Sequence, residues 1–160
     1  MSVAFTKEDS AETAAETMLP DRPISAAPNL VTAAGLAALQ EQFDAARAAY
    51  DAASAIEDVN ERRRQGAGPL RDLRYFAERL RTAQLMPHPA TTDMVAFGHS
   101  VTYRRDDGAV QSYAIVGEDE ADPASGSMSY LAPVAQRLTG KAVGDIVELG
   151  ERELEIIAIA

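Results

Sequence analysis

Apolar side chains recur at alternating three- and four-residue intervals in two stretches of the first half of the chain. The first stretch contains Leu36, Leu39, Phe43, Ala46 and Tyr50, and the second contains Leu73, Phe76, Leu80 and Ala83. This spacing is typical of the apolar seam of a coiled coil, because residues three and four apart share one helix face. One narrow seam cannot be buried alone, so the pattern predicts an antiparallel helical hairpin over residues 32–86. Thr32 is expected to cap the first helix.

Two signals compete for the position of the hairpin turn. Antiparallel pairing of the seams, for example Leu39 with Leu80, gives residue numbers that add up to 119, and this predicts a turn near 59–60 within residues 56–61. Asp58 and Glu61 have the spacing of a capping box for the second helix. The rival turn is residues 65–68, with Pro69 as the first residue of the second helix. We favour the first turn, although it places two glycines and this proline inside a helix, where they are unfavourable.

The segments on either side of the hairpin differ in character. Residues 1–31 hold Pro20, Pro23 and Pro28, which prevent a long helix, so we expect a flexible N-terminal arm with residues 1–20 disordered and 21–31 extended. An inert terminus is the simpler interpretation of this arm, with a functional tail as the alternative. Residues 87–94, which contain Pro87 and Pro89, are predicted to be a linker.

From Val95 onward the apolar pattern changes to the alternation that is typical of strands. Strands are predicted at 101–105 and 110–116, joined by the hairpin turn 106–108, and at 128–131, 146–149 and 154–159. Pro133 is expected to open a short helix through Leu138, with Gly140 as its left-handed cap. The predicted fold class is therefore α+β: a helical hairpin, then a small β-rich domain over 95–160 with about five strands and one short helix.

Composition narrows the function classes. The chain has 160 residues, of which 25 are acidic and 15 basic, for a net charge of −10. This balance argues against autonomous nucleic-acid binding, because phosphates require Lys and Arg. No apolar stretch is long enough for a membrane span, no secretory signal is evident, and the chain has no Cys, so we expect a cytoplasmic protein without disulfides or thiolate metal sites. The charge is uneven, since residues 32–86 are neutral and residues 95–160 carry −6.

Residues that carry chemistry form only weak patterns. His88 and His99 belong to no triad or metal motif, and both are expected to be exposed structural residues. The basic run consists of Arg62, Arg63 and Arg64. It either contacts a phosphate backbone or an acidic partner protein, or it is simply a solvated helix face near acidic residues. These acidic residues are Glu57, Asp58 and Glu61, and their spacing is not diagnostic of a metal site. The acidic loop that follows Gly117 is interpreted as a recognition loop, and we predict no catalytic residue, metal or cofactor.

Several segments of the chain contain short sequence motifs that are typical of a known family. Residues 97–102, 115–122, 131–138 and 140–145, together with 31–36 and 83–86 at the hairpin ends, resemble the bacterial Gre transcript-cleavage factors (GreA/GreB). The resemblance covers about residues 29–160 in order. It implies an FKBP-like C-terminal domain that docks at the rim of the secondary channel of RNA polymerase. It also implies a coiled coil that enters this channel, with tip acids that help to hold a catalytic magnesium and activate water.

The predicted hairpin departs from this family at its tip. Nothing between residues 50 and 70 reproduces the family's tip motif, Gly-Asp-x-Ser-Glu-Asn-Ala-x-Tyr. The hairpin is also shorter by roughly twenty residues, about ten per arm, which corresponds to ~15 Å of helix. We therefore do not carry the catalytic acids over to Glu57, Asp58 or Glu61. The short hairpin is similar to that of Rnk-type regulators.

The resulting hypothesis is a monomeric Gre-family regulator that occupies the secondary channel of RNA polymerase and lacks strong cleavage activity. It is not itself an enzyme, and at most it stimulates the polymerase's own RNA cleavage. The predicted docking residues are Asp119, Glu120, Asp122, Pro123 and Pro133, and the predicted tip residues are Glu57, Asp58, Glu61, Arg62, Arg63 and Arg64. The alternative is an active stimulator that uses the three tip acids. A prolyl isomerase rests on fold analogy alone.

Overall fold

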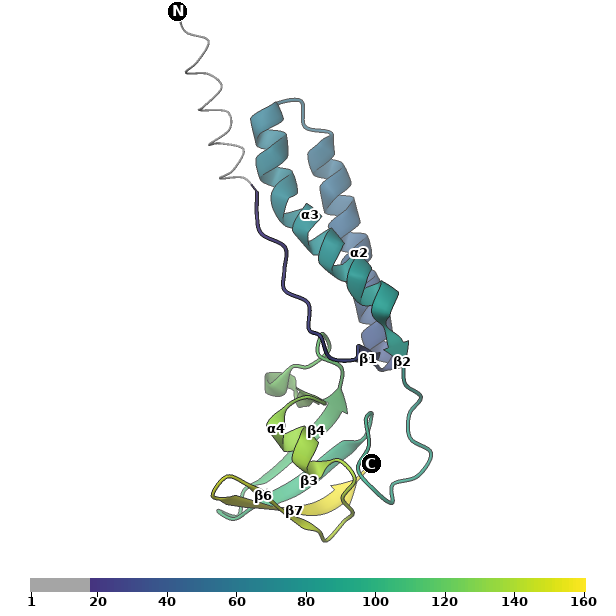
Figure 1. Cartoon of the computed structure of the whole chain (residues 1–160), viewed down its shortest axis with the longest axis vertical. Coiled ribbons are helices and arrows are strands. Elements are labelled where there is room, and N and C mark those ends of the chain that lie inside the picture. Colours follow the sequence, from purple (N-terminus) through teal and green to yellow (C-terminus); the bar gives the residue numbers. More distant parts are fainter. Residues whose placement is uncertain (1–17) are drawn as a thin grey trace, which may run out of the picture. The chain divides into compact units, whose positions relative to one another are not determined.

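The computed structural model describes residues 18–160, which form two compact units (Figure 1). Within the described residues, the hairpin unit contains residues 18–27 and 39–82, and the sheet unit contains residues 28–38 and 83–160. Residues 1–20 were predicted to be disordered, and residues 1–17 of this segment lie outside the described residues. None of the helices in residues 18–160 is both long enough and apolar enough to cross a membrane.

Two long helices dominate the first half of the chain: α2 (Ala33–Ser54) and α3 (Val59–Thr82). Along α2, the seam positions from Leu39 to Tyr50 are buried or half-buried, and Ala53 extends this buried row by one step, whereas the charged residues between them are exposed. The seam positions Leu73 and Phe76 of α3 are half-buried. The helical hairpin of the predicted α+β fold class is therefore confirmed.

The turn of the hairpin lies at residues 55–58, so the rival turn at 65–68 is wrong, and the favoured turn near 59–60 was placed about three residues too late. Asp58 caps α3, because its Oδ1 accepts a hydrogen bond of 2.7 Å from the backbone N–H of Glu61. Gly66 lies inside α3 and is buried. A Cβ added to Gly66 would lie 3.7 Å from Cβ of Ala53, and these two positions again add up to 119.

The sheet unit contains a five-stranded mixed sheet with the order β5-β4-β3-β7-β6. Its elements are β3 (Ser100–Arg105), β4 (Val110–Val116), the 3-10 helix η1 (Pro123–Ser125), β5 (Ser127–Ser129), α4 (Pro133–Leu138), β6 (Ile146–Leu149) and β7 (Arg152–Ile159). All five strands were predicted, although β5 begins one residue earlier and ends two residues earlier than expected. The helix α4 has the predicted bounds, and Gly140 follows it with a φ of 82°.

Two very short strands were not predicted. They are β1 (Leu30–Val31) and β2 (Gln84–Leu85), which pair in parallel. The backbone N–H of Gln84 donates to the carbonyl of Asn29 at 2.8 Å, and that of Met86 donates to the carbonyl of Val31 at 2.9 Å. A two-residue strand is too short to show an alternating pattern, so the sequence carries no signal for this pairing.

The apolar core of the sheet unit lies between the sheet and α4 (Figure 1). Ala135 and Leu138 of α4 are buried against strand residues that include Val101, Ile115 and Ile156. Pro133 at the first turn of α4 has no N–H to lose there, and its backbone dihedral suits a helix start. The alternation that predicted the strands therefore also identified the residues of this core.

His99 is fully buried, so the expectation that it is exposed was wrong, whereas His88 is exposed. Nδ1 of His99 accepts a hydrogen bond of 3.0 Å from the backbone N–H of Ala96. The proton of a neutral ring is therefore on Nε2, which lies 2.9 Å from the carbonyl oxygen of Thr91. The imidazole thus satisfies one backbone group of the linker, at Thr91, and one just after it, at Ala96, which is a structural role.

Tyr103 supplies a prediction about alkaline stability. Burial raises the pKa of its phenol above the ordinary value, because the phenolate is disfavoured in the core, and the charge of Tyr113 acts in the same direction. The folded chain therefore holds this proton more tightly than the unfolded chain, whose phenol has a pKa of about 10. We expect this contribution to stability to be complete below about pH 10 and to be lost as the pH rises further.

The measurement is urea unfolding of the wild type and of Tyr103→Phe at pH 8 and again above pH 10. The variant is expected to lose less of its free energy of unfolding between these pH values than the wild type. An equal loss in both proteins would show that Tyr103 does not cause the alkaline sensitivity.

Candidate functional site

The acidic loop between β4 and η1 contacts the start of α2 within the sheet unit. The Thr32 hydroxyl donates a hydrogen bond of 2.6 Å to Oε2 of Glu120, and its oxygen accepts one of 3.0 Å from the backbone N–H of Gly35. Thr32 is therefore the N-cap that was predicted. The Glu120 carboxylate lies at the positive end of the α2 dipole, where negative charge is stabilising. Glu120 is half-buried by this contact.

Two glycines allow the loop and the helix start to approach each other. A Cβ added to Gly35 would lie 2.4 Å from Oε2 of Glu120, and a Cβ added to Gly117 would lie 2.3 Å from the carbonyl oxygen of Leu30. Both distances are far below van der Waals contact. The hydroxyl of Tyr130 also donates to the carbonyl of Pro28, which fixes the same segment. The family-like segments 31–36 and 115–122 therefore contact each other directly.

The other predicted docking residues are exposed. Asp119 and Asp122 are exposed in the acidic loop, and Pro123 is exposed at the start of η1. Oδ2 of Asp122 accepts a hydrogen bond of 2.7 Å from the Ser125 hydroxyl, which holds η1 to the loop. Pro133 is exposed on a separate element, at the start of α4. The structure thus brings Asp119 to Pro123 together in one loop, in which Glu120 is engaged with Thr32.

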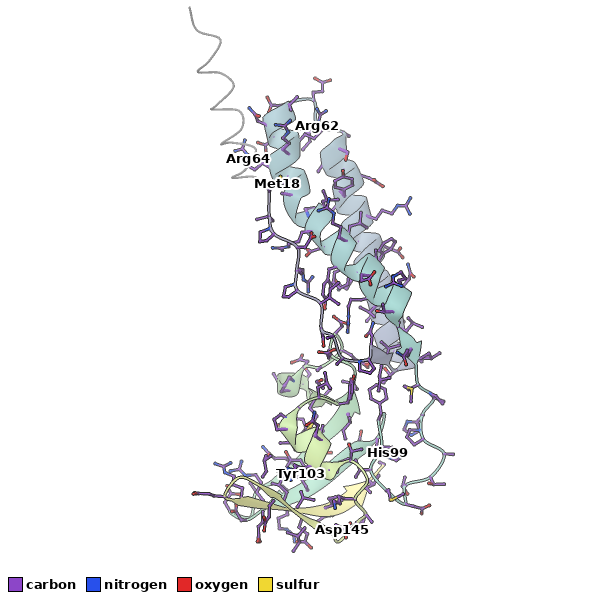
Figure 2. The ribbon with its side chains drawn as sticks, in the orientation of Figure 1. Met18, Arg62, Arg64, His99, Tyr103 and Asp145 are labelled. Carbon is purple, nitrogen blue, oxygen red and sulfur yellow. The ribbon has the colours of Figure 1, made fainter. Side chains whose placement is uncertain are left out.

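The predicted tip residues lie at the loop end of the hairpin, where Arg62 and Arg64 are labelled in Figure 2. The carboxylate of Asp58 caps α3, and Oε2 of Glu61 forms an ion pair of 2.8 Å with Arg64. Glu57 is exposed in the turn. In the chain from residue 18 onward, no three His, Cys, Asp or Glu side chains are close enough to hold a metal ion. Two of the three tip acids are therefore engaged in local contacts of the hairpin.

Two parts of the site were missed by sequence reasoning. One is the contact between Thr32 and Glu120, which are 88 positions apart, so no local pattern connects them. The other is a groove on the hairpin unit that includes Arg71 and Arg74, neither of which had been predicted as a site residue. A signal for this groove existed in part, because Arg71 and Arg74 follow the basic run 62–64 at helical spacing.

Comparison with known proteins identifies the family. The family model described as "Transcription elongation factor, GreA/GreB, C-term" matches residues 90–160. "Transcription elongation factor GreA" of Desulfovibrio desulfuricans is 37% identical over 119 residues, which cover 71% of this chain and 68% of that protein. The protein of the same name from Brucella canis is 37% identical over 117 residues, covering 70% and 69%. The chain belongs to the GreA/GreB family of transcription elongation factors.

Among solved structures, GreA factor homolog 1 (Gfh1) of Thermus thermophilus is 21% identical to this GreA/GreB-family chain, with a TM-score of 0.39. The alignment covers 84% of this chain and 99% of the Gfh1 chain. The family match over residues 90–160 contains all five predicted docking residues of this GreA/GreB-family factor. The tip residues 57–64 lie outside it.

Proposed function

We propose that this GreA/GreB-family factor binds RNA polymerase at the rim of the secondary channel and inserts its hairpin there without strongly stimulating RNA cleavage. The proposal rests on the membership of this chain in a family of transcription elongation factors. RNA polymerase is the partner that the family resemblance implies. In this role the protein is a regulator that acts on the polymerase and is not itself an enzyme.

The sheet unit is proposed to supply the docking surface. It carries most of the net negative charge of the chain, with −6 on residues 95–160. Asp119, Asp122 and Pro123 are exposed on its acidic loop, and Pro133 is exposed on α4. Exposed carboxylates steer association with a positively charged surface, and this acts mainly on the association rate and on specificity. Glu120 is proposed to act indirectly, because its contact with Thr32 holds the loop in place.

The hairpin is proposed to obstruct the channel rather than to deliver a catalytic metal. Its helices have 22 and 24 residues, which correspond to arms of about 33 and 36 Å. Asp58 caps α3 and Glu61 pairs with Arg64, so both carboxylates already have partners that compete with a metal ion. The family's acidic tip motif is also absent from residues 50–70. These observations favour a hairpin that limits access to the channel.

A cleavage assay tests this part of the proposal. We expect no release of 3′-terminal RNA fragments above background when the protein is added to backtracked elongation complexes. The matched variant is Glu57→Gln/Asp58→Asn/Glu61→Gln, which removes three negative charges, while asparagine at position 58 preserves the helix cap. The variant is expected to give the same background as the wild type. Fragment release by the wild type that disappears in this variant would contradict the proposal and establish an active stimulator.

A further inference from the structure

The hairpin unit contains a groove that the proposed docking function does not use. Its volume is about 560 Å³, within the range of small-molecule sites. It lies beside residues 18–19, the last turns of α2 and residues 62–74 of α3. Figure 2 shows Met18 next to the loop end of α3, where Arg62 and Arg64 are labelled. All the groove residues belong to one compact unit.

One side of the groove is strongly basic. Four arginines line it, namely Arg62, Arg63, Arg71 and Arg74. Among the described residues, no acidic side chain lines the groove. The guanidinium group of Arg63 has neither a hydrogen bond nor an ion pair with any residue from 18 to 160. Nε of Arg71 is buried without a hydrogen bond, and its nearest carboxylate oxygen, on Asp72, is 3.5 Å away. The groove therefore holds guanidinium groups whose donors are not all used, which favours an anionic ligand.

The remainder of the groove is apolar and includes one aromatic ring. Tyr50 is half-buried in it, and Leu70 lines it from α3. Met18 is 78% exposed and Leu19 is 43% exposed, so both present apolar surface to solvent beside the arginines. Inorganic phosphate would satisfy the guanidinium groups but leave this apolar surface uncovered. A ligand that fits both sides carries phosphates at one end and a flat, stacking group at the other.

We propose that this groove binds a free nucleoside polyphosphate. Its phosphates are held by Arg62, Arg63 and Arg71, and its base packs against Tyr50 and Leu70. Arginine suits this role because its planar, always charged fork matches phosphate geometry and also stacks on flat rings. The site is separate from the proposed docking residues of the sheet unit. It therefore does not depend on whether the protein binds RNA polymerase.

The test is titration calorimetry of the full chain with GTP, ATP and inorganic triphosphate at about 0.15 M salt, where unspecific charge attraction is screened. We expect saturable binding of at least one nucleotide, and weaker binding of triphosphate alone. Arg63→Ala and Arg71→Ala are expected to weaken nucleotide binding about tenfold, or ~1.4 kcal/mol. Arg47→Ala is the matched control, because Arg47 is an exposed arginine of α2 outside the groove, and it should change nothing.

Further experiments distinguish the contribution of the base to binding from that of the phosphates, and binding of free nucleotides from binding of RNA. Tyr50→Leu should remove the preference for GTP or ATP over triphosphate, because it removes the ring but keeps apolar volume. Circular dichroism of each variant checks that the helices are retained. The proposal is overturned by a lack of saturable binding, or by equal loss in Arg47→Ala and Arg63→Ala. It is also overturned if a short RNA oligonucleotide binds through the groove arginines and free nucleotides do not.

Discussion

Replacing Gly117 by alanine is expected to destabilise the sheet unit by about 1–3 kcal/mol, the usual cost of overpacking a closely fitted site. The added Cβ would lie 2.3 Å from the carbonyl oxygen of Leu30, and a backbone atom cannot rotate away as a side chain does. The acidic loop or the segment at β1 must therefore shift. That shift also draws Glu120 away from Thr32, whose hydrogen bond of 2.6 Å depends on the same approach.

Urea unfolding of Gly117→Ala and of a control, Gly68→Ala, measures this effect. A Cβ at Gly68 has no other atom within 4 Å, so the control introduces the same methyl group without a clash. The free energy of unfolding should fall clearly in Gly117→Ala and should not fall in Gly68→Ala, because alanine favours the helix α3 more than glycine does. If Gly117→Ala is as stable as the wild type, the close approach of the loop to β1 does not occur in the protein.

Reversing the charge of the exposed loop acids is expected to weaken binding to RNA polymerase about tenfold or more, which corresponds to ~1.4 kcal/mol. The variant is Asp119→Lys/Asp122→Lys, at two exposed positions of the proposed docking surface. The change places positive charge where the proposed partner surface is positive, so it should slow association and disfavour the complex. The effect should diminish at high salt, because both positions are exposed to solvent.

The matched control is Glu148→Lys/Glu151→Lys, which changes the net charge by the same amount at two exposed positions of the same unit. Binding can be measured by fluorescence anisotropy of the labelled protein with core RNA polymerase. We expect the loop variant to bind weakly and the control to bind almost as tightly as the wild type. Equal weakening in both variants would mean that net charge matters and that the acidic loop is not the docking surface.

Periodic patterns predicted most of the fold, because burial along a regular element repeats with the period of that element. The seam from Leu39 to Tyr50 predicted α2, and the alternation from Val110 to Val116 predicted β4 with its bounds. The rival turn at 65–68 is wrong because Gly66 and Pro69 are tolerated inside α3. Gly66 packs against Ala53 there, so tertiary packing overrides the low helix propensity of glycine.

Features that depend on contacts between distant residues could not be predicted. His99 was expected to be exposed because a single polar residue has no period, and its burial depends on two backbone groups, at Thr91 and Ala96, that only the folded chain presents. Glu120 was assigned to docking because it belongs to an acidic run. Its partner Thr32 lies 88 positions earlier in the sequence, so only the structure reveals the contact. The family-like segments 31–36 and 115–122 gave no indication in the sequence that they contact each other.

The central claim is that this family member occupies the polymerase channel without providing cleavage chemistry, and a competition assay tests it most directly. Backtracked elongation complexes receive a fixed amount of a GreA cleavage factor and increasing amounts of this protein, and 3′-terminal RNA fragments are counted. The proposal predicts that cleavage by GreA declines as this protein is added, and that Asp119→Lys/Asp122→Lys fails to inhibit. Unchanged cleavage at saturating protein, or fragment release by this protein alone, would contradict the claim.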